Sequence, residues 1–309
     1  MEGILSSLEE QRVFALEENR RTGAFMFKWG VATTLASIAA TVLISPQWIL
    51  SIVIPVAIAA ACMRSINERK SEVLCLFKDE AIPLLLKEKL PGFSYSREGC
   101  IDEDEFSGCG LFISPDSYCG KDCFCGTRGR TSLRFSMVHA EEEYEETVYS
   151  TDSDGNDTSY TQTCWRDIFR GLFFVADFNK DFLHNTVVSA GRPGLFSFLS
   201  SDRVKLEDPR FNDRFTVRSG DQIEARYILT PRLMERIVSL NDSMGGVEIS
   251  FWNSSVYIAA GSIPYNAFTP DIDRPFSDPE QLKDIMAWIR LVLDIVDELD
   301  LNTRIWSKR

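Results

Sequence analysis

The sequence has little of what most enzymes and nucleic-acid-binding proteins use. It contains only two histidines, His139 and His184, and neither has a spacing to other ligand residues that is typical of a metal site. No serine lies in a nucleophile elbow, and no glycine-rich loop has the spacing that binds phosphate. Lys and Arg number 33 against 46 Asp and Glu, which gives a net charge of −13. A chain this acidic repels a phosphate backbone, so we expect no nucleic-acid partner. Because these binding motifs are missing, we also expect no cofactor.

A secretory signal is also missing from the N-terminal region. The first 24 residues carry five Glu and no apolar run, whereas a signal peptide needs a basic start followed by an apolar segment. We therefore expect no secretory signal peptide in these residues.

Charge is absent from one long stretch, residues 29–63, which "SPQ" at 45–47 divides into two apolar blocks. Lys28 can extend its ammonium towards lipid headgroups, so the first block can begin at Ala24 and reach membrane-spanning length. The stretch predicts a transmembrane helical hairpin over residues 24–63. A buried hairpin in a soluble core and a re-entrant segment are the alternatives.

Basic residues flank this hairpin and are missing from its turn. Positive charge stays on the cytoplasmic side, which predicts a multi-pass protein of the inner membrane with both termini in the cytoplasm. The flanking residues are Arg12, Arg20, Arg21, Lys28, Arg64, Arg69 and Lys70.

Small residues recur every four positions in the first block, and such stripes let helices approach closely, within the hairpin or between subunits. A proline in the second block predicts a kink. The residues for which we expect transmembrane packing are Ala32, Ala36, Ala40, Thr33, Ser37, Thr41 and Pro55.

The remaining sequence predicts three further parts: an N-terminal cytosolic helix over 1–23, a connecting amphipathic helix over 64–90, and a cytosolic α+β domain over 91–309. Two long alternating segments flank "TDSDGND" and predict a β-hairpin whose acidic cluster, eight acidic residues and no basic one from Glu141 to Asp157, is a solvated arm.

Further along, a second hairpin turns at residues 253–255, and Pro231 opens a helix. The C-terminal helix follows Asp278 and Pro279, with Gln281 placed as in a capping box.

Several stretches resemble a bacterial family catalogued as a domain of unknown function, numbered thirty-one thirty-seven. They are "DSYCGKDCFCG", "FRGLFFVADFNKDF" and "RFNDRFTVRSGDQIEARYILTPRLMERI". The resemblance, with the preceding membrane hairpin, spans nearly the whole chain. It implies the same topology but no reaction, ligand or catalytic residue. The thiols at 119, 123 and 125 depart from the family pattern.

Five cysteines lie close together in the sequence, and Cys119-x3-Cys123 has the spacing of one half of a zinc site. A second close pair is missing, while Cys123 and Cys125 alternate as they would on one face of a strand. We therefore expect free thiols and no metal. A metal site and a redox pair are the alternatives, and the candidate metal ligands are Cys100, Cys109, Cys119, Cys123 and Cys125.

The aromatic-rich stretch from Phe169 to Phe178 predicts a core strand, or else part of a pocket or partner surface. The candidate residues for such a pocket or partner surface are Phe173, Phe174, Phe178, Arg226 and Tyr227.

Together these features predict a protein that acts by binding, as a scaffold, sensor or adaptor at the inner membrane face. A membrane-tethered enzyme and an oligomeric membrane effector are the alternatives. The expected partners are membrane lipid and another membrane protein or a second copy of the chain.

Overall fold

A computed structural model describes residues 2–43, 48–151, 157–178, 181–191, 202–299 and 301, without the side chains of residues 2, 34–43, 48–52, 54, 150–151 and 157–158. It forms two compact units. The first contains Met1–Lys89 and Thr269–Ile285, and the second contains Leu90–Phe268 and Met286–Arg309.

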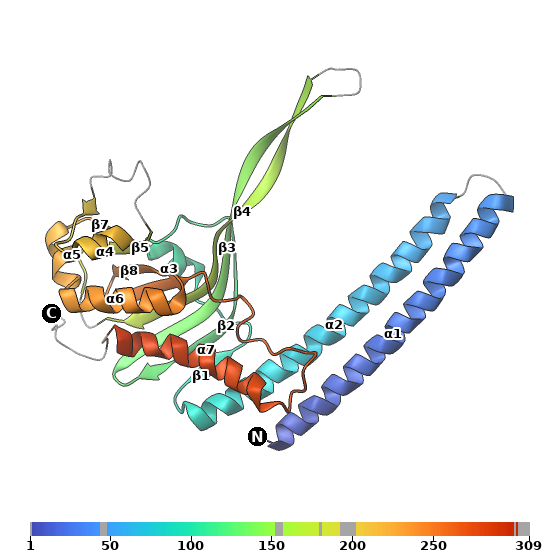
Figure 1. Ribbon diagram of the computed structural model, residues 1–309, viewed down its shortest axis with the longest axis horizontal. Coiled ribbons are helices and arrows are strands. Elements are labelled where there is room, and N and C mark those ends of the chain that lie inside the picture. Colours follow the sequence, from blue (N-terminus) through green and yellow to red (C-terminus); the bar gives the residue numbers. More distant parts are fainter. Residues whose placement is uncertain are drawn as a thin grey trace. The chain divides into compact units, whose positions relative to one another are not determined.

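The first unit is built on two long helices that run side by side, α1 (Glu2–Leu43) and α2 (Trp48–Lys89) (Figure 1). The separate helix expected over 1–23 is continuous with the first half of the hairpin, and the helix expected over 64–90 continues the second half. No proline lies at either junction. Pro55 and Pro83 lie inside α2, where each removes one backbone donor without ending the helix.

The segment from Thr269 to Ile285 packs on these helices through polar and aromatic contacts. Arg12 Nη1 donates to the carbonyl of Ile272 at 2.9 Å, and the amide of Phe276 donates to Glu9 Oε2 at 2.7 Å. The Phe276 ring lies 4.7 Å from the ring of Phe77, which is fully buried. A loop distant in sequence is therefore fixed to the helical hairpin.

Among the described residues, no helix is both long enough and apolar enough to cross a membrane. The described part of the chain thus does not support the predicted transmembrane spans. The side chains of Ala36, Ala40, Ser37 and Thr41 lie outside the described residues, as does the turn at 44–47. Of the other predicted packing residues, Ala32 is exposed, whereas Thr33 and Pro55 are half-buried.

The second unit contains one antiparallel sheet of nine strands, in the order β1-β2-β3-β4-β9-β8-β5-β7-β6. This unit confirms the predicted α+β class. The strands are β1 (Ser94–Ser96), β2 (Ser117–Arg128), β3 (Thr131–Thr151), β4 (Asp157–Asp177), β5 (Thr186–Ala190), β6 (Arg203–Val204), β7 (Phe215–Ser219), β8 (Glu248–Trp252) and β9 (Ser255–Ala260).

Helices occupy both faces of this sheet (Figure 1). The predicted helix after Pro231 is α6 (Pro231–Met244), capped by the Thr230 hydroxyl, and the predicted C-terminal helix is α7 (Pro279–Glu298). Arg236 ties α6 to the end of α7 by donating to the carbonyls of Asp297 and Glu298. The remaining helices are α3 (Glu103–Gly108), α4 (Pro209–Arg214) and α5 (Gln222–Ile228).

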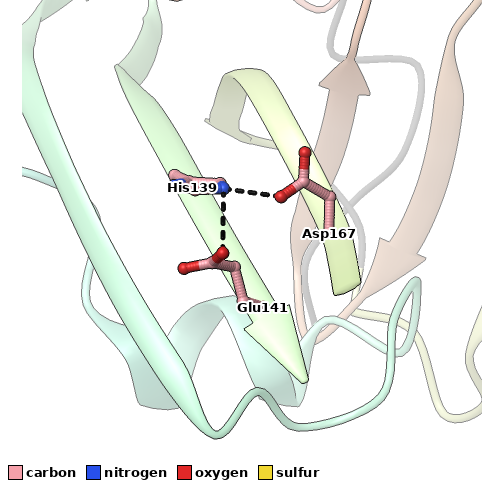
Figure 2. Close-up of side chains that lie close together, drawn as sticks. All are labelled: His139, Glu141 and Asp167. Atoms are coloured by element: carbon pink, nitrogen blue, oxygen red, sulfur yellow. Dashed lines mark hydrogen bonds and ion pairs between the residues drawn. The ribbon is translucent and has the colours of Figure 1, made fainter. Parts of the chain in front are cut away.

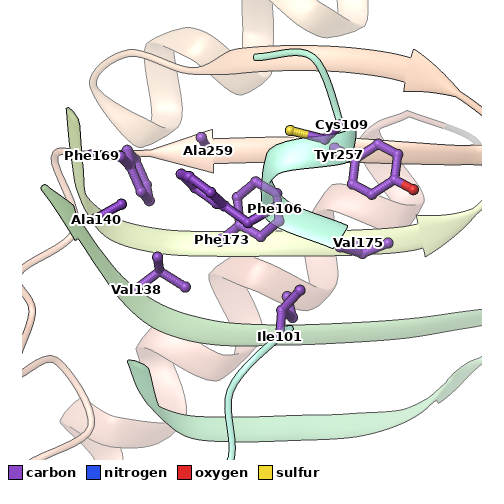
Figure 3. Close-up of a cluster of buried hydrophobic side chains, with 10 residues drawn as sticks. All are labelled: Ile101, Phe106, Cys109, Val138, Ala140, Phe169, Phe173, Val175, Tyr257 and Ala259. Carbon is purple, nitrogen blue, oxygen red and sulfur yellow. The ribbon is translucent and has the colours of Figure 1, made fainter. Parts of the chain in front are cut away.

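The core on the face that α3 covers is a cluster of aromatic and aliphatic side chains around Phe106 of α3 (Figure 3). Phe106 lies 5.1 Å from Phe173, edge to face, and both rings are fully buried. Alternation along β4 puts Phe174 on the other face, where it is also fully buried. The predicted core strand is therefore buried on both faces, which explains its continuous apolar run.

Candidate functional site

Strands β3 and β4 continue well beyond the rest of the sheet (Figure 1). β2 pairs with β3 only as far as Glu141, and β9 pairs with β4 only from Leu172 onwards. Residues 142–151 and 157–166 pair only with each other. We call this two-stranded extension the β3–β4 ribbon. It is the long hairpin predicted around "TDSDGND".

Four aromatic side chains of the ribbon are exposed: Tyr144 at 39%, Tyr149 at 80%, Tyr160 at 55% and Trp165 at 50%. A two-stranded ribbon gains little stability from burial of its own side chains. Large aromatic residues held in water are typical of surfaces that bind a partner.

The strand register divides the ribbon into two faces that differ in charge. Residues directly opposite each other share a face, as Glu143 and Trp165 do. We call one side the acidic face; its charged and aromatic members are Glu143, Glu145, Tyr149 and Trp165. The other is the paired face; its members are Glu142, Tyr144, Glu146, Tyr160, Cys164 and Arg166.

Charge on the paired face is partly neutralised within that face. The Arg166 guanidinium lies 2.5 Å from Glu142 and stacks over the Tyr144 ring at 5.6 Å. The acidic face has no basic residue of the ribbon, because Arg166 is the only Lys or Arg between Glu141 and Asp167. The acidic face therefore combines unneutralised carboxylates with Tyr149 and Trp165.

A β-bulge lies where the ribbon leaves the sheet. Ala140 pairs with Phe169, but the next residue, Glu141, pairs with Asp167, so Ile168 is an extra residue in β4. In a regular ladder without this bulge, Glu141 would pair with Ile168, and Asp167 would point to the opposite side of the sheet. The bulge thus places Asp167 on the face that carries His139 and Glu141.

These three side chains converge at the base of the ribbon (Figure 2). The Nε2 atom of His139 lies 2.7 Å from Asp167 Oδ1 and 3.7 Å from Glu141 Oε1. His139 and Glu141 are half-buried, and Asp167 is exposed. Their ligand atoms all lie within 4.8 Å of one another, and they form the one such group of three or more found in the described residues.

Further reactive and charged side chains lie beside this cluster. In the register, Cys119 and Arg170 are opposite His139 on the two neighbouring strands. The Tyr265 ring lies 6.2 Å from the His139 ring, with Lys121 at 4.3 Å and Arg170 at 5.3 Å from its centroid. Burial, together with the adjacent Cys119 thiol, raises the pKa of Tyr265 to about 12. The phenol therefore stays neutral at physiological pH and can donate a hydrogen bond.

The structure separates the cysteines that the sequence places together. A second bulge, between Lys121 and Phe124, interrupts β2, so Cys119 and Cys123 lie on opposite faces of the sheet despite their zinc-like spacing. Cys123 and Cys125 share a face, with sulfur atoms 3.7 Å apart, and Phe124 packs on the other face against Phe135. Cys109 is buried in the core around Phe106. All eight cysteines of the chain are free thiols.

The aromatic and charged residues considered for a pocket or partner surface do not gather in one place. Phe173, Phe174 and Phe178 are buried core side chains. Arg226 and Tyr227 are exposed on α5, where Arg226 donates to the carbonyl of Lys205.

Sequence reasoning missed the cluster at the base of the ribbon. The signal for part of it is present, since His139 and Glu141 are two residues apart on a predicted strand and so share a face. The third member, Asp167, depends on the strand register and on the bulge at Ile168, neither of which a sequence pattern shows.

Comparison with known proteins supports the resemblance described above. Residues 167–301 match the family model described as "Protein of unknown function (DUF3137)". The predicted resemblance to this family is confirmed over these residues. The match starts at Asp167 and leaves β2, β3 and most of the ribbon outside it.

No curated protein matches the chain. A similar solved structure is the crystal structure of the mycobacterial trehalose monomycolate transport factor A, TtfA, with 11% identity and a TM-score of 0.32. The similarity covers 67% of this chain and 88% of that chain. At this score the likeness carries no argument about function.

Proposed function

We propose that the protein acts by binding, and that the acidic face of the β3–β4 ribbon is the surface that contacts its partner. The observation that carries this proposal is the exposure of Tyr149 and Trp165 among carboxylates that no basic residue of the ribbon neutralises. The complementary partner is a protein with a basic surface that also offers aliphatic or aromatic contacts. Nucleic acid does not fit this charge.

We also propose that the helical hairpin of α1 and α2 anchors the chain in the inner membrane, with both termini in the cytoplasm. Support comes from the sequence, in which residues 29–63 carry no charge and basic residues flank them on both sides. Membrane lipid is then a partner of the hairpin, and the ribbon's protein partner is another membrane protein or a protein that comes to the membrane surface.

The two faces of the ribbon offer a matched test of the binding proposal. A photo-crosslinking amino acid replaces Tyr149 on the acidic face in one variant of the full chain, and Tyr160 on the paired face in another. In cells, position 149 should give a discrete protein adduct that position 160 gives weakly or not at all. Both side chains are exposed, so accessibility to the crosslinking chemistry does not explain a difference between them.

Charge reversal then tests the chemistry of the partner. Glu143→Lys with Glu145→Lys should reduce the adduct from position 149 by ~10-fold, and raised salt applied to isolated membranes should act in the same direction. Equal adducts from the two faces, or an adduct that is indifferent to charge reversal and salt, would contradict the assignment of the acidic face.

A further inference from the structure

The base of the ribbon places two carboxylates opposite each other on neighbouring strands. Glu141 of β3 and Asp167 of β4 are direct cross-strand partners on one face. Like charges in this position destabilise a sheet unless a cation lies between them. In the described part of the chain, neither carboxylate forms an ion pair with a Lys or Arg, and each pairs only with His139.

His139 supplies the third ligand-type side chain, and its geometry fits a shared ion. It reaches both carboxylates through the same atom, Nε2, at 2.7 Å and 3.7 Å. Ligand bonds of about 2.1 Å place two donors of a tetrahedral site about 3.4 Å apart. Small side-chain rotations therefore bring the imidazole nitrogen and two carboxylate oxygens to the spacing that a metal ion requires.

We propose that His139, Glu141 and Asp167 form a binding site for a divalent transition-metal ion. One imidazole and two carboxylates suit Mn²⁺, Fe²⁺ or Zn²⁺ better than Ca²⁺ or Mg²⁺, which prefer oxygen ligands alone. The side chains of His139, Glu141 and Asp167 are 19%, 27% and 53% exposed, so the ion enters from solvent. Three protein ligands leave positions for water.

The bulge at Ile168 gives this site its specific position. It turns Asp167 towards His139 at the point where β3 and β4 leave the sheet. An ion held there by both strands links them across the bulge. The site is separate from the aromatic residues of the acidic face, and its test does not depend on the partner proposed above.

The proposal is tested by titrating the full chain with Mn²⁺ in detergent, after a chelator has removed bound metal. Binding is measured as the loss of the electron paramagnetic resonance signal of free Mn²⁺. Mn²⁺ is chosen because it prefers oxygen and imidazole ligands over the thiols that this chain also carries. We expect one ion per chain, and at least ~10-fold weaker binding in Glu141→Gln, Asp167→Asn and His139→Ala.

The chain contains a matched control for the histidine. His184 is the second of its two histidines and lies 3.2 Å from a single carboxylate, Glu224. His184→Ala should bind Mn²⁺ as the unsubstituted chain does, and so should Cys123→Ser with Cys125→Ser.

Mn²⁺ should also raise the unfolding temperature of the unsubstituted chain but not that of Asp167→Asn. The isosteric Gln and Asn variants keep the test valid if His139→Ala unfolds. No Mn²⁺ binding, or binding that survives both isosteric substitutions, would overturn the proposal.

Discussion

Burial gives individual thiols of this chain different reactivities. Burial raises the pKa of Cys109 to about 11, and burial with the adjacent Cys125 thiol raises that of Cys123 to about 12. Alkylation needs the thiolate and access to the reagent. Cys109 and Cys123 are buried, whereas Cys119 is exposed. Iodoacetamide at pH 8 should modify Cys119 at least ~10-fold faster than Cys109 or Cys123, as measured by peptide mass spectrometry. Similar rates in the folded chain would show that this account is wrong; in urea the rates should converge.

Glu9 shows how one ion pair makes stability depend on pH. The side-chain hydrogen bond from Arg12 is the main cause that lowers the pKa of Glu9, and the amide of Phe276 adds to it. A lowered pKa contributes stability that is present above the unfolded value, about 4.3, and is lost as pH falls through the folded value.

Glu9→Gln should therefore cost about 1–2 kcal/mol at pH 7, with much less difference from the unsubstituted chain below pH 3. Thermal unfolding followed by circular dichroism at the two pH values measures this difference. Glu10→Gln, one position away, is the control and should have little effect at either pH. If the loss of stability in Glu9→Gln does not change with pH, packing of the side chain rather than its charge explains the loss.

At the scale of strands, the bulge at Ile168 decides which side chains meet. Inserting one threonine between Ala140 and Glu141 gives Ile168 a partner and makes the ladder regular. It also moves Glu141 and Asp167 to the opposite face from His139, because side chains alternate along a strand. Mn²⁺ binding should be lost although all three ligand residues remain. The control is the same insertion between Ser153 and Asp154, which should leave binding unchanged; Mn²⁺ binding retained after the first insertion would contradict the assigned role of the bulge.

Local sequence patterns predicted the elements that depend only on their own residues. Pro231 opens a helix that Thr230 caps, and Asn253 and Ser254 have the positive φ angles, 51° and 62°, of a tight hairpin turn. The predicted capping box failed, because contacts with the loop before the helix decide where the Gln281 side chain lies. The Gln281 amide donates to the carbonyls of Arg274 and Pro275 rather than completing a capping box. The two bulges are likewise set by neighbouring strands, so neither the separation of Cys119 from Cys123 nor the meeting of His139 with Asp167 could be read from spacing.

For the whole molecule, the proposed membrane anchor depends on residues 29–63, which lack charge. The chain should sediment with membranes, resist extraction by alkaline carbonate and dissolve in detergent. Ile38→Lys with Ile54→Lys should release it, because each lysine near a span centre costs about 2.5–3.5 kcal/mol of insertion free energy. Ile4→Lys with Ile113→Lys adds the same charge outside the hairpin and should leave the chain in the membrane.

The predicted orientation follows from the same charges. With both termini in the cytoplasm, a tag after Arg309 should be labelled by an impermeant reagent only after the inner membrane is opened. Lysis without detergent decides the anchor itself. If the unsubstituted chain stays in the supernatant, the hairpin does not anchor it in the membrane. If a C-terminal tag is labelled while the inner membrane is intact, the predicted cytoplasmic position of the C-terminus is wrong.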